Sequence, residues 1–115
     1  PRPIAQDERG RISQLLDWIR AHPTRDLSLS ALAKRAAMSE RTLQRQFLQL
    51  TNTTPKEWIA RERVALAKEL LESSSTSLVR IVALTGFGSE ETFRRQFKRI
   101  TATSPLAYRK QFFGN

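Results

Sequence analysis

The sequence predicts an all-α fold of seven helices, organised as two helix-turn-helix subdomains joined by a long linker helix. Apolar residues recur at helical spacing along the chain, and no stretch alternates convincingly with the period of two expected of a half-buried strand. A 17-residue segment is also used twice, because residues 39–55 and 89–105 are identical at nine aligned positions. A repeat of this length indicates one supersecondary unit that occurs in two copies.

The first half is expected to contain three helices. The first carries an i, i+3, i+4, i+7 apolar pattern and ends before Pro23. Ser28 and Ser39 are suitable N-caps for the next two helices, which are separated by a short turn. A short helix, a tight turn and a second helix are typical of helix-turn-helix geometry.

The second half follows the same plan after a long connecting helix. Thr54, Pro55 and Glu57 supply an N-cap, a first-turn proline and a capping-box acid, so a helix is expected from here to about Glu72. Later starts are expected at three positions: Ser77, Ser89 and Ser104. The resulting division of the chain is a linker from a missing N-terminal domain (1–8), a first subdomain (9–54), the connecting helix (55–73) and a second subdomain (74–115).

Composition favours a polyanionic partner and weighs against an enzyme. Twenty basic and 11 acidic residues among 115 give a net charge of +9. This charge alone does not show whether the partner is DNA, RNA or a membrane surface. There is one histidine, no cysteine, no Gly-rich phosphate loop and no long apolar run. The missing site chemistry predicts no catalytic residue, no cofactor and no metal. The missing cysteines and long apolar run predict a cytoplasmic protein without a membrane partner, which is nucleoid-associated if the polyanion is DNA.

The second helix of each unit has one apolar and one polar face. The residues expected to point inward are Leu43, Phe47 and Leu50, and then Phe93, Phe97 and Ile100. Arginine suits guanine and glutamine suits adenine in the major groove, so the opposite faces are candidates for reading bases. These base-reading candidates are Arg41, Gln44, Arg45, Glu91, Arg94 and Arg95. Any surface helix exposes such residues, but their recurrence behind matched turns favours recognition.

Phosphate contacts are expected around the same helices. A helix N-terminus attracts anions, which makes Ser39 and Ser89 candidates in addition to their role as N-caps. The further candidates are Lys98, Lys56 and Arg109. The last two are equally well explained as residues that simply face water.

Two motifs carry a resemblance to a known family. SLSALAKRAAMSERTLQRQF and SLVRIVALTGFGSEETFRRQFKRITATSPLAYR are similar to the DNA-binding domain of the AraC/XylS family of bacterial transcription regulators, over roughly residues 9–113. The resemblance implies double-stranded promoter DNA as partner, two recognition helices on one side of the molecule, and transcription activation with contact to RNA polymerase. It also implies a further effector-sensing or dimerising domain before this one.

Alternatives remain open beside this interpretation. They are a non-specific nucleic-acid-binding module, including one for RNA, and a helical protein-interaction module. The fragment itself is expected to be monomeric, because both halves have complete cores, whereas the full-length protein is expected to dimerise through the missing domain.

The chain departs from the family pattern at three positions. Ala37 stands where the first turn commonly has glycine, which predicts a differently shaped turn, because a left-handed alanine costs roughly 1 kcal/mol or more. Asn52 and Ala102 replace a glycine that usually follows each recognition helix. Asparagine tolerates the left-handed conformation, whereas the alanine has no evident explanation in the sequence.

Overall fold

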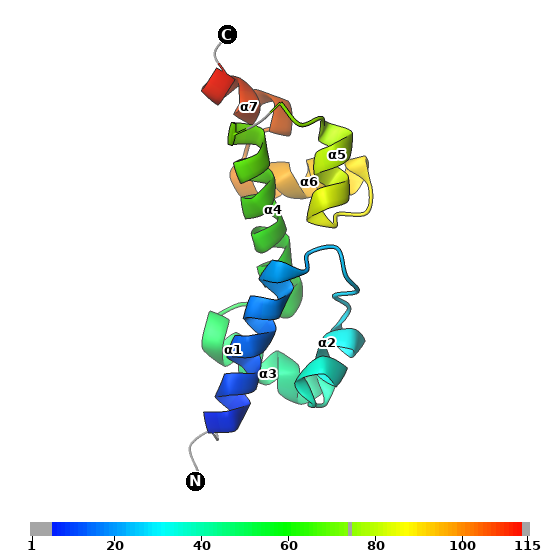
Figure 1. The fold of residues 1–115 in the computed structure, drawn as a ribbon. Coiled ribbons are helices and arrows are strands. Elements are labelled where there is room, and N and C mark those ends of the chain that lie inside the picture. The colour runs from blue at the N-terminus through cyan, green and yellow to red at the C-terminus, as the bar shows by residue number, and fades with distance from the viewer. Residues whose placement is uncertain (1–5, 74, 114–115) are drawn as a thin grey trace. The chain divides into compact units, whose positions relative to one another are not determined.

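Seven α-helices account for most of the computed structural model, which describes residues 6–73 and 75–113, the first three of these by backbone alone (Figure 1). The helices are α1 (Gln6–Ala21), α2 (Leu29–Ala36), α3 (Glu40–Thr51), α4 (Pro55–Ser73), α5 (Leu78–Thr85), α6 (Glu90–Thr101) and α7 (Pro105–Phe113). The expected fold class is confirmed. Residues 6–8, expected in a linker, belong to α1, and the rest of that linker lies outside the described residues.

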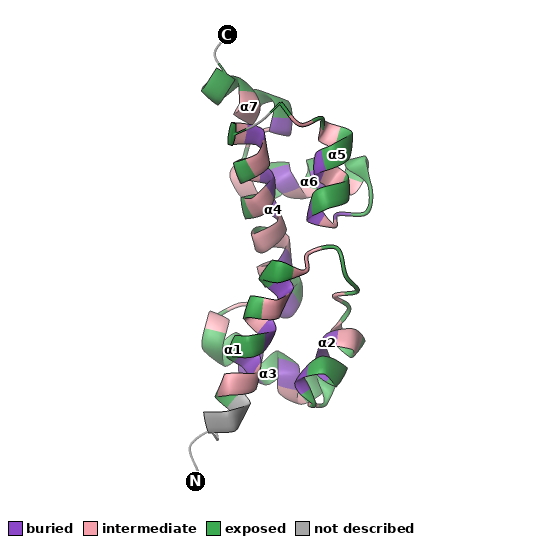
Figure 2. Cartoon of the chain, in the orientation of Figure 1, coloured by how far each residue is buried: buried purple, intermediate pink, exposed green. Residues whose placement is uncertain are grey.

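The helices form two compact units whose boundary falls inside α4, between Ile59 and Ala60. The first unit holds α1 to α3 and the beginning of α4, and the second holds the remainder of α4 with α5 to α7. Each unit has its own core, and its buried residues lie on the faces that its helices turn toward one another (Figure 2).

The core of the first unit is aliphatic apart from one aromatic residue. It consists of Ile12, Leu15, Ile19, Leu32, Ala33, Ala36, Leu43, Phe47 and Ile59. Trp58 packs on this core from α4, where its ring meets Phe47 edge to face at 5.8 Å between ring centroids. This is the packing role expected for a tryptophan at helical spacing.

The core of the second unit contains more aromatic rings. It consists of Val64, Ala67, Leu71, Ile81, Phe87, Phe93 and Phe97. Tyr108 occupies the place that Trp58 has in the first unit, because its ring meets Phe97 edge to face at 5.6 Å. The repeat is therefore preserved in packing as well as in sequence.

One expected inward residue is exposed. Leu50 retains 37% of its accessible surface, whereas Leu43 and Phe47 are fully buried. Leu50 lies in the last turn of α3, where neighbouring helices no longer cover the side chain. Its equivalent Ile100 packs against the second core and is half-buried.

The N-caps are confirmed by hydrogen bonds. The Ser28 hydroxyl accepts from the Ala31 N–H at 3.2 Å, and Ser77 accepts from Arg80 N–H at 3.1 Å. The Thr54 hydroxyl likewise accepts from the Glu57 N–H at 3.1 Å, at the start of α4. Each bond satisfies one of the N–H groups that the first turn of a helix leaves without a helical partner.

The turns before α3 and α6 adopt the same left-handed cap despite different residues. Ala37 has φ 57° and Gly86 has φ 86°, so the expectation that the alanine turn would avoid this conformation is wrong. The backbone N–H of Met38 donates to the Ala33 carbonyl at 2.9 Å and closes the first turn. The second turn is longer by Gly88, which also has a positive φ, 87°.

Candidate nucleic-acid interface

Helices α3 and α6, the expected recognition helices, are held by matching contacts at both ends. At their N-termini the Ser39 hydroxyl accepts from the Thr42 N–H and the Ser89 hydroxyl from the Thr92 N–H, each at 3.1 Å. Both hydroxyls also donate to the threonine hydroxyl of the same pair at 3.0 Å. The two serines are exposed N-caps, so their expected phosphate contacts remain predictions.

The C-termini of these helices are fixed by a threonine that the repeat keeps identical. The Thr101 hydroxyl donates to the Phe97 carbonyl at 2.8 Å and accepts from the Thr103 N–H at 3.3 Å. Thr51 makes the same two bonds in the first unit. These bonds span the left-handed residue that follows each helix, and they explain how Ala102 is held at φ 65°.

The six base-reading candidates are all exposed on the outward faces of α3 and α6. Arg94 lies within 3.5 Å of the Glu90 carboxylate, an i, i+4 pair on the surface. Among the described residues, the other five side chains make no hydrogen bond or ion pair: Arg41, Gln44, Arg45, Glu91 and Arg95. Arg45 and Arg95 therefore form no salt bridge with any residue that the structure describes.

The basic phosphate candidates differ in their surroundings. Lys56 and Lys98 are exposed at the start of α4 and on α6. Arg109 is half-buried, and its guanidinium donates to the Thr76 carbonyl at 2.7 Å and to the Leu71 carbonyl at 3.3 Å. These bonds give Arg109 a structural function in the second unit, and its phosphate contact stays a prediction.

Sequence reasoning missed two residues that support the first recognition helix. Gln46 is almost completely buried on α3, although its polarity suggests a surface position. Arg11 of α1 reaches the C-terminus of α2, where its guanidinium donates to the Ala37 carbonyl at 3.2 Å. The identity of Gln46 and Gln96 in the repeat is a sequence signal for Gln46. No local pattern indicates the contact of Arg11.

The described residues contain no cluster of histidine or acidic side chains that could hold a metal ion. Within the same ranges, no helix is both long and apolar enough to span a bilayer.

A family model described as a helix-turn-helix domain matches residues 32–111. A Chromobacterium violaceum transcriptional regulator of the AraC type superposes with a TM-score of 0.82 over 96% of this chain and 98% of that chain, and at 24% identity it supports the fold alone. The chain belongs to the AraC family of helix-turn-helix DNA-binding domains. As a transcription-factor DNA-binding domain it is not an enzyme.

Two further relatives are closer in sequence. The DNA-binding domain of AdpA, solved in complex with a target DNA, has 34% identity, a TM-score of 0.85, and covers 89% of this chain and 92% of that one. The transcriptional activator RhaS of Yersinia pestis bv. Antiqua (strain Angola) is 36% identical over 108 residues. That alignment covers 94% of this AraC-family chain and 40% of RhaS, so the chain spans about two fifths of such curated relatives.

Proposed function

We propose that this AraC-family domain binds double-stranded promoter DNA sequence-specifically, with α3 and α6 in successive major-groove segments. The observation that carries the proposal is the pairing of two matched helices, each with one buried and one exposed polar face. Five of the six candidate side chains have no partner among the described residues and are available for base edges, and arginine and glutamine suit guanine and adenine. The AdpA domain, at 34% identity, was solved with target DNA.

Each side chain has a proposed role on DNA. Base edges are read by the first helix through Arg41, Gln44 and Arg45, and by the second through Glu91, Arg94 and Arg95. Phosphates are contacted by the helix N-termini at Ser39 and Ser89 and by the basic residues Lys56, Lys98 and Arg109.

The wider role is proposed from the relatives. RhaS is described as a transcriptional activator, and we extend activation and contact with RNA polymerase to the protein that contains this domain. Such a protein acts in the cytoplasm, at the nucleoid. We propose that the domain itself is monomeric and that the full-length protein dimerises through another domain.

Selection of bound sites from random duplex DNA tests the function directly. The two outward faces differ in charge, since Glu91 stands where the first unit has Arg41, so the selected sites should contain two unlike segments. Competition with RNA of matched sequence at fixed salt is the control. Equal competition by RNA, or no enriched sequence, would instead indicate a non-specific nucleic-acid module.

A further inference from the structure

A basic groove lies beside Trp18 in the first unit, between α1 and α2; His22 stacks on the indole at 4.7 Å between ring centroids. Two neighbouring cavities, of about 450 and 230 Å³, share Trp18 and Arg35 in their walls. Arg25 and Lys34 complete the cationic lining of the larger cavity, and Arg11 that of the smaller one. Nothing in the proposed contacts to DNA uses this groove.

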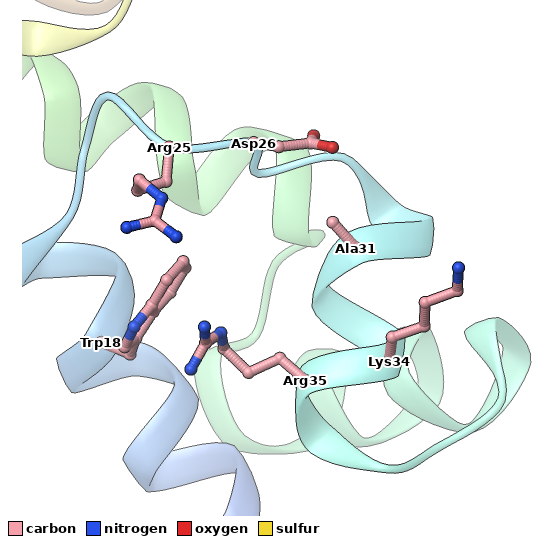
Figure 3. A pocket seen from close by; sticks show the side chains of 6 residues that line it. All are labelled: Trp18, Arg25, Asp26, Ala31, Lys34 and Arg35. Atoms are coloured by element: carbon pink, nitrogen blue, oxygen red, sulfur yellow. The ribbon is translucent and has the colours of Figure 1, made fainter.

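Two guanidinium groups converge on the same indole ring. The Cζ atom of Arg35 lies 3.8 Å from the Trp18 ring centroid and that of Arg25 lies 5.9 Å from it. Figure 3 shows both guanidiniums directed toward the indole, whereas Asp26 and Lys34 point away from it. Among the described residues, no carboxylate pairs with either arginine. The positive charge of both guanidiniums is therefore not compensated by a carboxylate, which favours an acidic ligand at this groove.

The one acid at the rim is engaged elsewhere. The Asp26 carboxylate accepts from the Ser28 N–H at 3.0 Å, and this bond holds the pKa of Asp26 below its ordinary value. In the smaller cavity, the Arg11 Nε is buried and has no hydrogen-bond partner among the described residues. Neither Asp26 nor the buried Arg11 Nε therefore neutralises Arg25 or Arg35 at the surface of the groove.

The groove opens away from the reading face of the same unit. Helices α1, α2 and α3 pack against one another in pairs, so the outer groove of α1 and α2 lies opposite α3. The outward side chains of α3 also point away from α1 and α2, because its other face is buried in their core. A duplex bound along α3 would leave the groove accessible.

The lining favours a macromolecular segment over a small molecule. Small-molecule sites bury roughly 70–90% of their ligand's surface, whereas Arg25, Lys34 and Arg35 are exposed and the groove is shallow. Tryptophan and arginine are the residue types most enriched where protein interfaces gain their affinity. We propose that this groove docks a glutamate- or aspartate-rich segment of a protein partner, with its carboxylates bound at Arg25 and Arg35. The biological meaning rests on the proposed function, since the partner would meet the domain at a promoter.

The test is a titration of the 115-residue chain with an oligo-glutamate peptide, followed by the NMR signal of the Trp18 indole N–H. Oligo-glutamine of equal length is the ligand control. We expect saturable shifts at Trp18 and no comparable shift at Trp58. Arg35→Ala should weaken peptide binding by about tenfold or more. Arg35→Lys should weaken it less, because the charge remains although the planar guanidinium is lost.

Arg9→Ala is the matched variant, because this exposed arginine lies in the same unit and lines neither cavity. If Arg9→Ala weakened the peptide as much as Arg35→Ala, the peptide would be binding the overall charge and the proposal would fail. Shifts at Trp18 with inorganic phosphate or duplex DNA but not with the peptide would also overturn it. Duplex binding is measured separately on each variant. If the chain binds DNA but not the peptide, the proposed docking groove is rejected and the proposed DNA-binding function is unaffected. The unaltered chain supplies the decisive signal even if one variant does not fold.

Discussion

The Tyr108 hydroxyl donates a hydrogen bond to the Glu72 carboxylate and so joins α7 to the last turn of α4. Burial, and then this carboxylate, raise the pKa of Tyr108 to about 12. Since the phenol is held neutral in the folded chain, the contact stabilises the second unit fully below the ordinary tyrosine pKa of about 10. That contribution is lost as the pH rises from there through about 12.

Tyr108 is the only tyrosine in the chain, so tyrosinate absorbance reports this one group. We expect the native titration near the raised pKa and the denatured titration near the ordinary one. Glu72→Gln should lower the native pKa, because the acceptor loses its charge, while burial still keeps it above the denatured value. A native pKa equal to the denatured one would show that neither burial nor Glu72 acts on the phenol.

Arg45 and Arg95 are the charged residues that the two copies keep identical at mid-helix on the outward face. Arg45→Ala and Arg95→Ala should each reduce specific DNA binding by about 1–3 kcal/mol and relax a different segment of the site. Melting temperatures should hardly change, because both side chains are exposed. Footprinting and thermal melts measure the two effects, with exposed Arg80→Ala on α5 as control. A melting loss without a binding loss would contradict the base-reading role.

DNA affinity should fall steeply with salt. With roughly six to ten phosphate contacts, the slope of log K against log salt should lie between about −5 and −9. Lys56→Ala and Lys98→Ala should each make the slope shallower by about 1. A slope in the unaltered domain shallower than about −2 would mean that the +9 charge makes few phosphate contacts.

Arg109→Ala should act on folding. Its guanidinium donates to two backbone carbonyls that would lose this donor, so the free energy of unfolding should fall by about 1–3 kcal/mol. Urea unfolding measures this change, with exposed Lys110→Ala as the neighbouring control. If Arg109→Ala instead made the salt dependence of DNA affinity shallower and left the free energy of unfolding unchanged, Arg109 would be assigned to a phosphate contact.

The left-handed alanines offer sites for stabilisation. Ala37→Gly and Ala102→Gly should each raise the free energy of unfolding, by up to about 1 kcal/mol, because glycine adopts this conformation without strain. The gain is reduced by the greater freedom of glycine in the unfolded chain. Asn52→Gly is the comparison, and its effect should be smaller. If thermal melts showed a lower melting temperature for both Ala37→Gly and Ala102→Gly, the left-handed alanines would not be a source of strain.

Much of the fold could be predicted because its signals are local. Ser28, Ser39 and Ser77 were recognised as N-caps from residue type and position, and each makes the expected hydrogen bond. The outward faces of α3 and α6 followed from helical spacing, and those side chains are indeed exposed. Their roles in DNA recognition stay predictions.

What could not be predicted depends on contacts between distant residues. Leu50 has the spacing of a core residue, but its burial depends on whether a neighbouring helix reaches the end of α3. The bonds of Arg11 and Arg109 join residues 26 and 33 positions apart, and no periodicity encodes them. The left-handed Ala37 likewise departs from its residue preference because the packing of α2 and α3 determines the turn.

The reading side chains have a consequence for how the domain would discriminate between DNA sites. Arg45 and Arg95 are exposed and have no partner among the described residues, so the proposed contacts with DNA would have to order both side chains. Ordering such a long side chain lowers the affinity gained from each contact by up to about 2 kcal/mol. In return, if these arginines read bases as proposed, the same side chain would reach different base edges and the domain would bind a family of related operators with graded strength. Arg94, already oriented by Glu90, would contribute the stricter preference.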